Sequence, residues 1–163
     1  MLVKVFRSLV LSALIFLIPL SAMAEDIRGK ENQTQEWDMI MGLFTRHVNP
    51  SSNTNETTGM LGFSYSNWVV HTFNNSYDER SFFGGRRFQT KALRHPRNRK
   101  FFVQGNLYAG LLQGYGDRFL NIAGVSVAAI PTIGFGYKKV AVEMLYVPTP
   151  SGGVFTSFLT YRF

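Results

Sequence analysis

The sequence predicts an all-β protein, an antiparallel β-barrel of eight strands, from three features of the chain. The last twelve residues alternate between apolar and polar side chains, a period of two that indicates a strand with two different environments. The first 24 residues have the pattern of an export signal. Between these ends, eight segments with strand character are separated by turns, and none of them is long and apolar enough for a transmembrane helix.

The amino terminus is predicted to be a secretory signal peptide, residues 1–24. Two basic residues precede the apolar run Leu9–Leu20, which is short for a membrane span of about 20 residues. Ser21-Ala-Met-Ala24 then supplies an A-x-A cleavage site. We expect the mature chain, residues 25–163, to form one barrel domain whose first part, residues 25–36, is a polar leader.

Eight segments are expected to form strands, an even number, as in single-chain bacterial barrels. Strands of about 9–11 residues are long enough to cross a bilayer at a tilt. A barrel of eight strands has a narrow lumen that holds side chains or one slim ligand. The predicted strands are Trp37–His47, Thr58–Ser66, Trp68–Phe73, Ser81–Thr90, Phe101–Gly114, Val125–Tyr137, Lys139–Val147 and Gly153–Phe163.

The carboxyl-terminal strand indicates which side chains would face lipid and which would face the lumen of the barrel. A chain that ends on an aromatic residue, here Phe163, is typical of barrels of the outer-membrane type, in which apolar side chains face lipid and polar ones face the lumen. An amphipathic strand of a soluble sandwich is the alternative interpretation. The lipid face would carry Phe155, Leu159, Tyr161 and Phe163, and the lumen face Thr156, Thr160 and Arg162.

Composition and charge agree with a membrane barrel and exclude several kinds of site. Glycine and phenylalanine each occur 15 times, charged residues make up 17% of the chain, and the mean hydropathy is −0.01. The absence of cysteine excludes a disulfide framework, a thiolate metal site and a cysteine nucleophile. The net charge of +7 suits anionic lipid or lipopolysaccharide phosphate better than nucleic acid.

The connections should differ between the two ends of the barrel. If both termini face the periplasm, the basic turn 91–100 is periplasmic. It is either a solvated turn or a contact with anionic headgroups of the inner leaflet. No motif that reads a nucleic-acid groove accompanies it. The extracellular connections would be 47–57, 74–80, 115–122 and 148–152.

Proline, glycine and one carboxylate interrupt the predicted strands. Pro131 cannot donate to a strand ladder, so it marks either an opening between strands, a side door for lipid, or a bulge. Glu143 would point into the lumen, where it needs a partner, and Arg162 and Arg86 are the expected candidates. Glycines in two strands either leave a cavity or accommodate curvature. They are Gly105, Gly110, Gly114, Gly134 and Gly136.

Several segments share an ordered pattern with a known enzyme family. Ile133-Gly-Phe-Gly-Tyr-Lys-Lys-Val-Ala-Val-Glu-Met-Leu-Tyr-Val-Pro148 contains an aromatic between glycines and a strand ending in Met-x-Tyr-x-Pro, and Gly152–Phe163 follows after a short loop. Pro131 lies just upstream. Phe44-Thr-Arg-His47 and Phe73-Asn-Asn-Ser-Tyr77 add a histidine after the first strand and a polar pair after the third. Together these segments resemble the lipid A palmitoyltransferase (PagP-type) family of outer-membrane acyltransferases.

The resemblance implies a function and a set of site residues. Enzymes of this family move a fatty acyl chain, palmitoyl-like, from a phospholipid to lipid A, and an apolar lumen holds the chain. By resemblance, the catalytic residues are His47, Ser76 and Asn75, the last standing where the family has an aspartate. Arg87 stands where a small residue would form the floor of the acyl pocket. We expect a monomer in the cell outer membrane, with a phospholipid donor and a lipopolysaccharide acceptor, and without cofactor, metal or nucleic acid.

The chemistry of these residues supports the hypothesis and leaves alternatives. Transacylation needs a proton acceptor, and His47 at the extracellular rim has the usual side chain for it near neutral pH. Ser76 would be a nucleophile or would hydrogen-bond a tetrahedral intermediate, and Asp78 or Glu79 would replace the missing carboxylate. The plain alternatives are a structural histidine and an ordinary Asn-Asn-Ser turn.

Two other functions remain open at this point. The first is a non-catalytic small barrel for adhesion or envelope integrity. The second is a lipid A deacylase, in which water takes the place of the acceptor hydroxyl. A metal site is not expected, because His71 has no carboxylate or second histidine at a suitable spacing, and His95 belongs to the basic turn.

Overall fold

The structure is a computed structural model that describes residues 36–48, 54–115, 121–149 and 152–163. The predicted signal peptide and residues 25–35 of the predicted leader lie outside the described residues. All regular structure in the described ranges is β. The strands are β1 (Trp37–Val48), β2 (Leu61–Tyr65), β3 (Trp68–Asn74), β4 (Arg80–Gln89), β5 (Leu93–Arg94), β6 (Phe101–Gln113), β7 (Asn121–Ile122), β8 (Val125–Tyr137), β9 (Val140–Thr149) and β10 (Gly152–Arg162).

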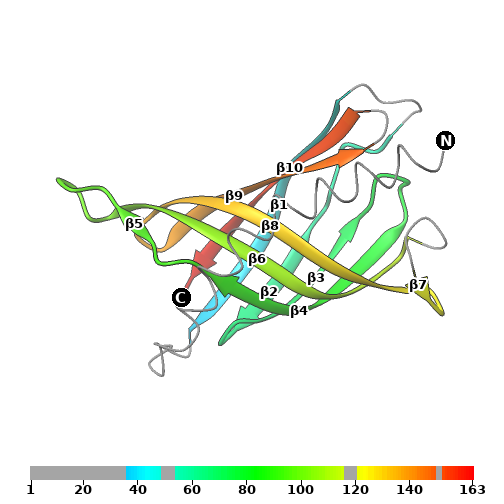
Figure 1. Cartoon of the computed structure of the whole chain (residues 1–163), viewed down its shortest axis with the longest axis horizontal. Coiled ribbons are helices and arrows are strands. Elements are labelled where there is room, and N and C mark those ends of the chain that lie inside the picture. Colours follow the sequence, from blue (N-terminus) through cyan, green and yellow to red (C-terminus); the bar gives the residue numbers. More distant parts are fainter. Residues whose placement is uncertain (1–35, 49–53, 116–120, 150–151) are drawn as a thin grey trace, which may run out of the picture. The chain divides into compact units, whose positions relative to one another are not determined.

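Eight of these strands close into an antiparallel barrel, as predicted (Figure 1). They follow one another around the wall in the order β1-β2-β3-β4-β6-β8-β9-β10, and β1 pairs with β10 to close it. The prediction missed only β5 and β7, which lengthen two hairpins by pairing with β6 and β8. Closure gives every long strand a neighbour on each side, although β8 and β9 pair with each other over only part of their length.

The barrel has two ends with different connections. At one of them, the terminal end, the first and last strands meet, and the backbone N–H of Phe163 donates to the carbonyl of Trp37 at 2.9 Å. The tight turns at Asn67 and Lys138 also lie there, with the left-handed backbone (φ 71° and 54°) that two-residue hairpins require. The opposite end, the loop end, carries the connections that follow β1, β3, β6 and β9.

The outward face of the barrel is apolar. Exposed aromatic side chains gather at the terminal end: Trp37, Tyr65, Trp68, Phe101, Tyr137, Tyr161 and Phe163. Further along the wall the exposed side chains include Leu61, Phe63, Val70, Phe82, Leu111, Val127, Ile133 and Phe135. A soluble barrel would show the reverse pattern, with polar side chains outward, so this face is of the kind that meets lipid. In the described residues no helix is both long and apolar enough to span a membrane.

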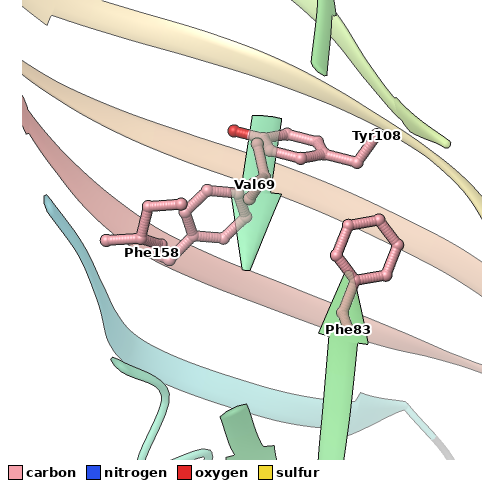
Figure 2. Packing of buried hydrophobic residues seen from close by; sticks show 5 residues of the cluster. Val69, Phe83, Tyr108 and Phe158 are labelled. Atoms are coloured by element: carbon pink, nitrogen blue, oxygen red, sulfur yellow. The ribbon is translucent and has the colours of Figure 1, made fainter. Parts of the chain in front are cut away.

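The lumen contains a buried apolar cluster formed by Ile40, Val69, Phe83, Tyr108 and Phe158. Figure 2 shows that the labelled side chains of this cluster point toward one another from different strands. The rings of Tyr108 and Phe158 meet edge to face with their centroids 5.9 Å apart. Side chains therefore fill this part of the lumen, one of the two outcomes expected for an eight-stranded barrel.

A polar network fills the lumen near the terminal end. Asp38 and Arg87 form a buried ion pair. Arg162 donates from Nε to Asp38 Oδ1 at 3.0 Å, and Ser64 donates from Oγ to Asp38 Oδ2 at 3.1 Å. The resemblance puts Arg87 at the floor of an acyl pocket, and the structure places it in the lumen as the partner of a carboxylate.

Glu143 points into the lumen as predicted, but its expected partners were wrong. Tyr108 donates to its carboxylate at 2.9 Å, Thr132 at 2.6 Å and Asn106 at 2.9 Å. Arg162 instead lies opposite Asp38 in the β1–β10 pairing, and Arg86 alternates to the outer face, where it stacks on Trp68. Gly134 lies opposite Glu143, and a Cβ there would come within 3.4 Å of the Glu143 side chain.

Pro131 lies where one strand ladder has ended. β8 pairs with β9 only over Ile133–Tyr137, opposite Val140–Met144, although both strands continue beyond that point. On its other side β8 pairs with β6 through Pro131 without a register shift. Proline has no backbone N–H to donate to a neighbouring strand. It is tolerated here because β9 does not pair with this part of β8, so no hydrogen bond between the two strands is lost. Of the two alternatives expected from the sequence, the geometry favours an opening between strands over a bulge.

Gly85 and Gly110 explain how the wall curves. They pair directly between β4 and β6, and a Cβ on either one would lie 2.3 Å from a carbonyl oxygen of the other strand. No side chain fits at that separation. These glycines therefore accommodate close approach and curvature, the second of the two roles expected for strand glycines.

Candidate active site

The loop end brings His47 and Ser76 together. His47 is two residues beyond Thr45, which faces the lumen and lies 3.0 Å from Thr156, Oγ1 to Oγ1, so the same strand alternation turns the half-buried imidazole inward. Ser76 lies in the connection that follows β3. The Nε2 atom of His47 and the Oγ atom of Ser76 are 2.9 Å apart, a hydrogen bond between residues 29 positions apart in the sequence. Two of the three predicted site residues therefore meet.

Asn75 holds the turn that presents Ser76. Its Oδ1 accepts hydrogen bonds from the backbone N–H groups of Tyr77 and Glu79 at 2.9 and 3.0 Å. Its Nδ2 donates to the carbonyl of Gly114 at 2.7 Å and to the hydroxyl of Ser81 at 3.1 Å. These four bonds use the two donors and two acceptor sites of the amide. The side chain is 2% exposed and is fully engaged in positioning the turn.

The acidic residue that contacts His47 is Glu56, which the sequence did not point to. Its Oε1 accepts a hydrogen bond from the backbone N–H of His47 at 3.2 Å, and its Oε2 lies 3.4 Å from Nη1 of Arg46. Asp78, one of the expected substitutes for the missing carboxylate, accepts a bond from Asn55 at 3.1 Å instead. No sequence motif links position 56 to position 47; only the chain path beside β1 brings them together.

The second imidazole nitrogen of His47 is buried. Among the described residues Nδ1 has no hydrogen-bond partner. If Nε2 accepts the hydroxyl proton of Ser76, Nδ1 carries the other ring proton, and the pair has the geometry of a nucleophile beside its base. If Nε2 donates instead, Ser76 orients the ring and Nδ1 is the basic atom. Both arrangements place a proton acceptor at the mouth of the barrel.

Aromatic side chains lie beside the site. The rings of Phe73 and Tyr77 are 6.4 and 6.5 Å from the ring of Tyr115, centroid to centroid. Burial, reinforced by the neighbouring Tyr77, raises the pKa of Tyr115 to about 12. The Tyr115 hydroxyl therefore stays protonated near neutral pH and adds no charge beside the site.

The other two histidines lie elsewhere. His71 is stacked on Phe83, with ring centroids 4.8 Å apart. His95 belongs to the basic turn, where its Nδ1 accepts a bond from the backbone N–H of Asn98 at 3.1 Å. Within the described ranges no group of three or more histidine, aspartate or glutamate side chains is arranged to hold a metal ion.

Comparisons with known proteins do not identify a function for this chain. No protein-family model matches the chain, and no curated protein matches it. The fold and the His47–Ser76 pair are therefore the observations from which a function is argued.

Proposed function

We propose that this chain is an outer-membrane acyltransferase that moves a fatty acyl chain from a phospholipid to lipid A. The observation that carries the proposal is the hydrogen bond of 2.9 Å between His47 Nε2 and Ser76 Oγ. This bond puts an imidazole beside a hydroxyl at the mouth of a barrel whose outer face is apolar, and we propose that the imidazole is the general base. A proton acceptor at that position serves acyl transfer between hydroxyl groups.

The apolar outer face supports placement in a bilayer. Exposed aromatic side chains at the terminal end match the girdle that anchors barrels at an interface. With the terminal end toward the periplasm, the loop end with His47 and Ser76 faces outward. Phospholipid misplaced in the outer leaflet and lipid A would both reach that rim.

The reaction we propose conserves one proton and one acyl group. An acceptor hydroxyl of lipid A gives its proton to His47 while its oxygen attacks the ester carbonyl of the phospholipid. The tetrahedral intermediate collapses by breaking the bond to the glycerol oxygen, which takes the proton back from His47. Ser76 either carries the acyl group between two such steps as an ester or holds the imidazole in place.

The end of the β8–β9 ladder supports a lateral path for lipid. Beyond Ile133 and Met144 the two strands do not pair, and Pro131 lies on that stretch of β8. A hydrocarbon chain entering there would avoid crossing a hydrogen-bonded wall.

A non-catalytic barrel is the second candidate, and the packed lumen favours it. Phe83, Tyr108 and Phe158 occupy space that an acyl chain would need. The polar network around Asp38 closes the lumen further toward the terminal end. In this reading the His47–Ser76 hydrogen bond only anchors the loop after β3 to β1.

Mass spectrometry of lipid A separates the candidates. Cells lacking lipid A acyltransferases of their own would express the parent chain, His47→Ala or the exposed loop-end control Thr57→Ala. A gain of one acyl chain with the parent and the control, but not with His47→Ala, supports the proposal. A loss of one acyl chain identifies a deacylase, and an unchanged mass with a folded, heat-modifiable parent in the outer membrane identifies a non-catalytic barrel.

A further inference from the structure

The terminal end carries a dense cluster of basic side chains on two neighbouring turns. We call it the basic patch: Lys91, Arg94, His95, Arg97, Arg99, Lys100, Lys138 and Lys139. All eight side chains are exposed. The two turns are joined by a hydrogen bond of 2.9 Å from the backbone N–H of Lys138 to the carbonyl of Lys100. Figure 1 shows the hairpin around β5 reaching beyond the neighbouring strands.

The basic patch is not neutralised by acidic side chains of the described residues. None of its side chains forms an ion pair with an aspartate or glutamate of the described residues. The single acidic residue in the sequence between Arg80 and Val142 is Asp117, which lies outside the described residues. Like charges held together without counter-charges repel one another, so the arrangement favours an anionic partner.

The hairpin that carries most of the patch is held by its own hydrogen bonds. The backbone N–H of His95 donates to the carbonyl of Phe101 at 3.0 Å. The guanidinium of Arg94 donates from Nη1 to the carbonyl of Arg99 at 2.9 Å and lies 5.6 Å above the ring of Phe102. The backbone of the hairpin and the guanidinium of Arg94 are therefore held in place before any partner arrives, which lowers the entropy cost of binding.

An apolar groove begins at the patch and continues onto the outer wall. It has a volume of about 690 Å³, and Arg94 and His95 are among the residues that line it. Its wall includes Leu93, which is 74% exposed, together with Val103 and Phe135, both exposed. The groove is continuous with the apolar outward face, so an acyl chain lying in it would also contact the bilayer. Cations above an apolar groove match an amphiphile with a negative headgroup.

We propose that the basic patch and this groove bind one anionic phospholipid of the leaflet at the terminal end. The phosphate would lie among Arg94, Arg97 and Lys138, and one acyl chain would lie along Leu93 and Phe135. The site is at the opposite end from His47 and Ser76. The proposed lipid site requires that the barrel lies in a bilayer. It does not require acyl transfer at His47 and Ser76.

Native mass spectrometry of the full mature chain in zwitterionic detergent tests the proposal. The barrel would be titrated with phosphatidylglycerol and with phosphatidylcholine of the same acyl chains. We expect retention of one phosphatidylglycerol at concentrations at which phosphatidylcholine is not retained. Equal retention of the two lipids would overturn the proposal.

Two matched variants locate the site. Arg94→Gln with Arg97→Gln should weaken phosphatidylglycerol binding by about thirtyfold, the effect of losing two surface cations. Arg46→Gln with Arg80→Gln removes the same charge at the loop end and should bind as the parent does. If the two double variants bind alike, the patch is not the site.

A third variant tests the groove apart from the charge. Leu93→Asn leaves every basic side chain of the patch in place, and heat-modifiable mobility checks that the variant folds. The variant should retain less phosphatidylglycerol than the parent does. Soluble glycerol phosphate, which has the phosphate but no acyl chain, should compete for the basic patch equally well in the variant and the parent. Retention at the parent's level would show that the headgroup alone is recognised and would refute the lipid site. None of these measurements involves lipid A, so their results do not depend on whether the chain catalyses acyl transfer.

Discussion

Asp38 of β1 and Arg87 of β4 form an ion pair across the lumen, although β2 and β3 separate their strands in the barrel wall. Their side chains are 4% and 5% exposed. Arg162 and Ser64 complete the bonds to the carboxylate. Because four strands contribute to one polar cluster, the pair fixes the relative position of β1, β2, β4 and β10 and closes the lumen near the terminal end.

Removing Arg87 should destabilise the barrel strongly. Arg87→Met leaves Asp38 buried with one cation fewer, and breaking a buried ion pair costs about 3–5 kcal/mol. The free energy of unfolding, measured by urea titration of the refolded barrel in detergent, should fall by that amount. Arg86→Met is the control, because Arg86 is exposed and stacks on Trp68, a contact worth about 0.5–1 kcal/mol. Equal losses in the two variants would contradict the network.

The glycine pair between β4 and β6 gives a second prediction, this time for assembly. Gly85→Ala should reduce the yield of folded barrel severely, because its Cβ would lie 2.3 Å from the carbonyl oxygen of Ala109. Gly84→Ala should have little effect, since no heavy atom lies within 4 Å of a Cβ at that position. The folded fraction is measured by heat-modifiable mobility on gels. A comparable yield of both variants would mean that the strands do not approach as closely as described.

The fold could be predicted because strand periodicity is a local property. In β10, alternation alone placed Thr156 and Thr160 in the lumen, and both are buried. Which inward side chains meet across the lumen depends on how the strands are staggered, and alternation does not give that. Glu143 was therefore given arginine partners, although it bonds to Tyr108, Thr132 and Asn106.

The candidate site was predictable only in part, for the same reason. His47 and Ser76 each end or follow a strand at the same end of the barrel, so topology alone put them at one rim. The role of Asn75 depends on four hydrogen bonds, two within the turn and two that reach β4 and the end of β6. Glu56 lies in a connection without periodicity, so nothing in the sequence placed it beside His47.

The His47–Ser76 pair gives a prediction about rate. His47→Ala should lower acyl transfer by about two to four orders of magnitude, the usual effect of losing a general base. Heat-modifiable mobility should remain at the parent's level, because residues at the rim contribute little to barrel stability. Transfer is measured with purified barrel and labelled phospholipid in mixed micelles.

Ser76→Ala separates the two roles open to the hydroxyl. If Ser76 carries the acyl group, the variant should be as slow as His47→Ala and the parent should form an acyl ester on Ser76 that mass spectrometry detects. If Ser76 only orients the ring, transfer should fall less and no ester should form. Transfer by both variants at the parent's rate would refute the proposed mechanism.

The last prediction concerns Asn75, for which the resemblance and the contacts point in opposite directions. The family aspartate suggests that Asn75→Asp would preserve or raise transfer. In the structure, however, Nδ2 of Asn75 donates to the carbonyl of Gly114 at 2.7 Å, and a carboxylate would put an oxygen against that oxygen. A buried group without its hydrogen bond costs about 1–3 kcal/mol. We therefore expect Asn75→Asp to loosen the turn that presents Ser76.

The readouts are hydrogen exchange and transfer rate. Backbone amides of the turn after β3 should exchange faster in Asn75→Asp than in the parent, and transfer should fall by up to about a hundredfold because Ser76 is displaced from His47. Asn74→Asp, which makes the same change one residue earlier at the end of β3, controls for the added charge. If Asn75→Asp keeps the turn protected and raises transfer, a carboxylate at position 75 serves the chemistry directly, and the anchoring role argued from its four hydrogen bonds is wrong.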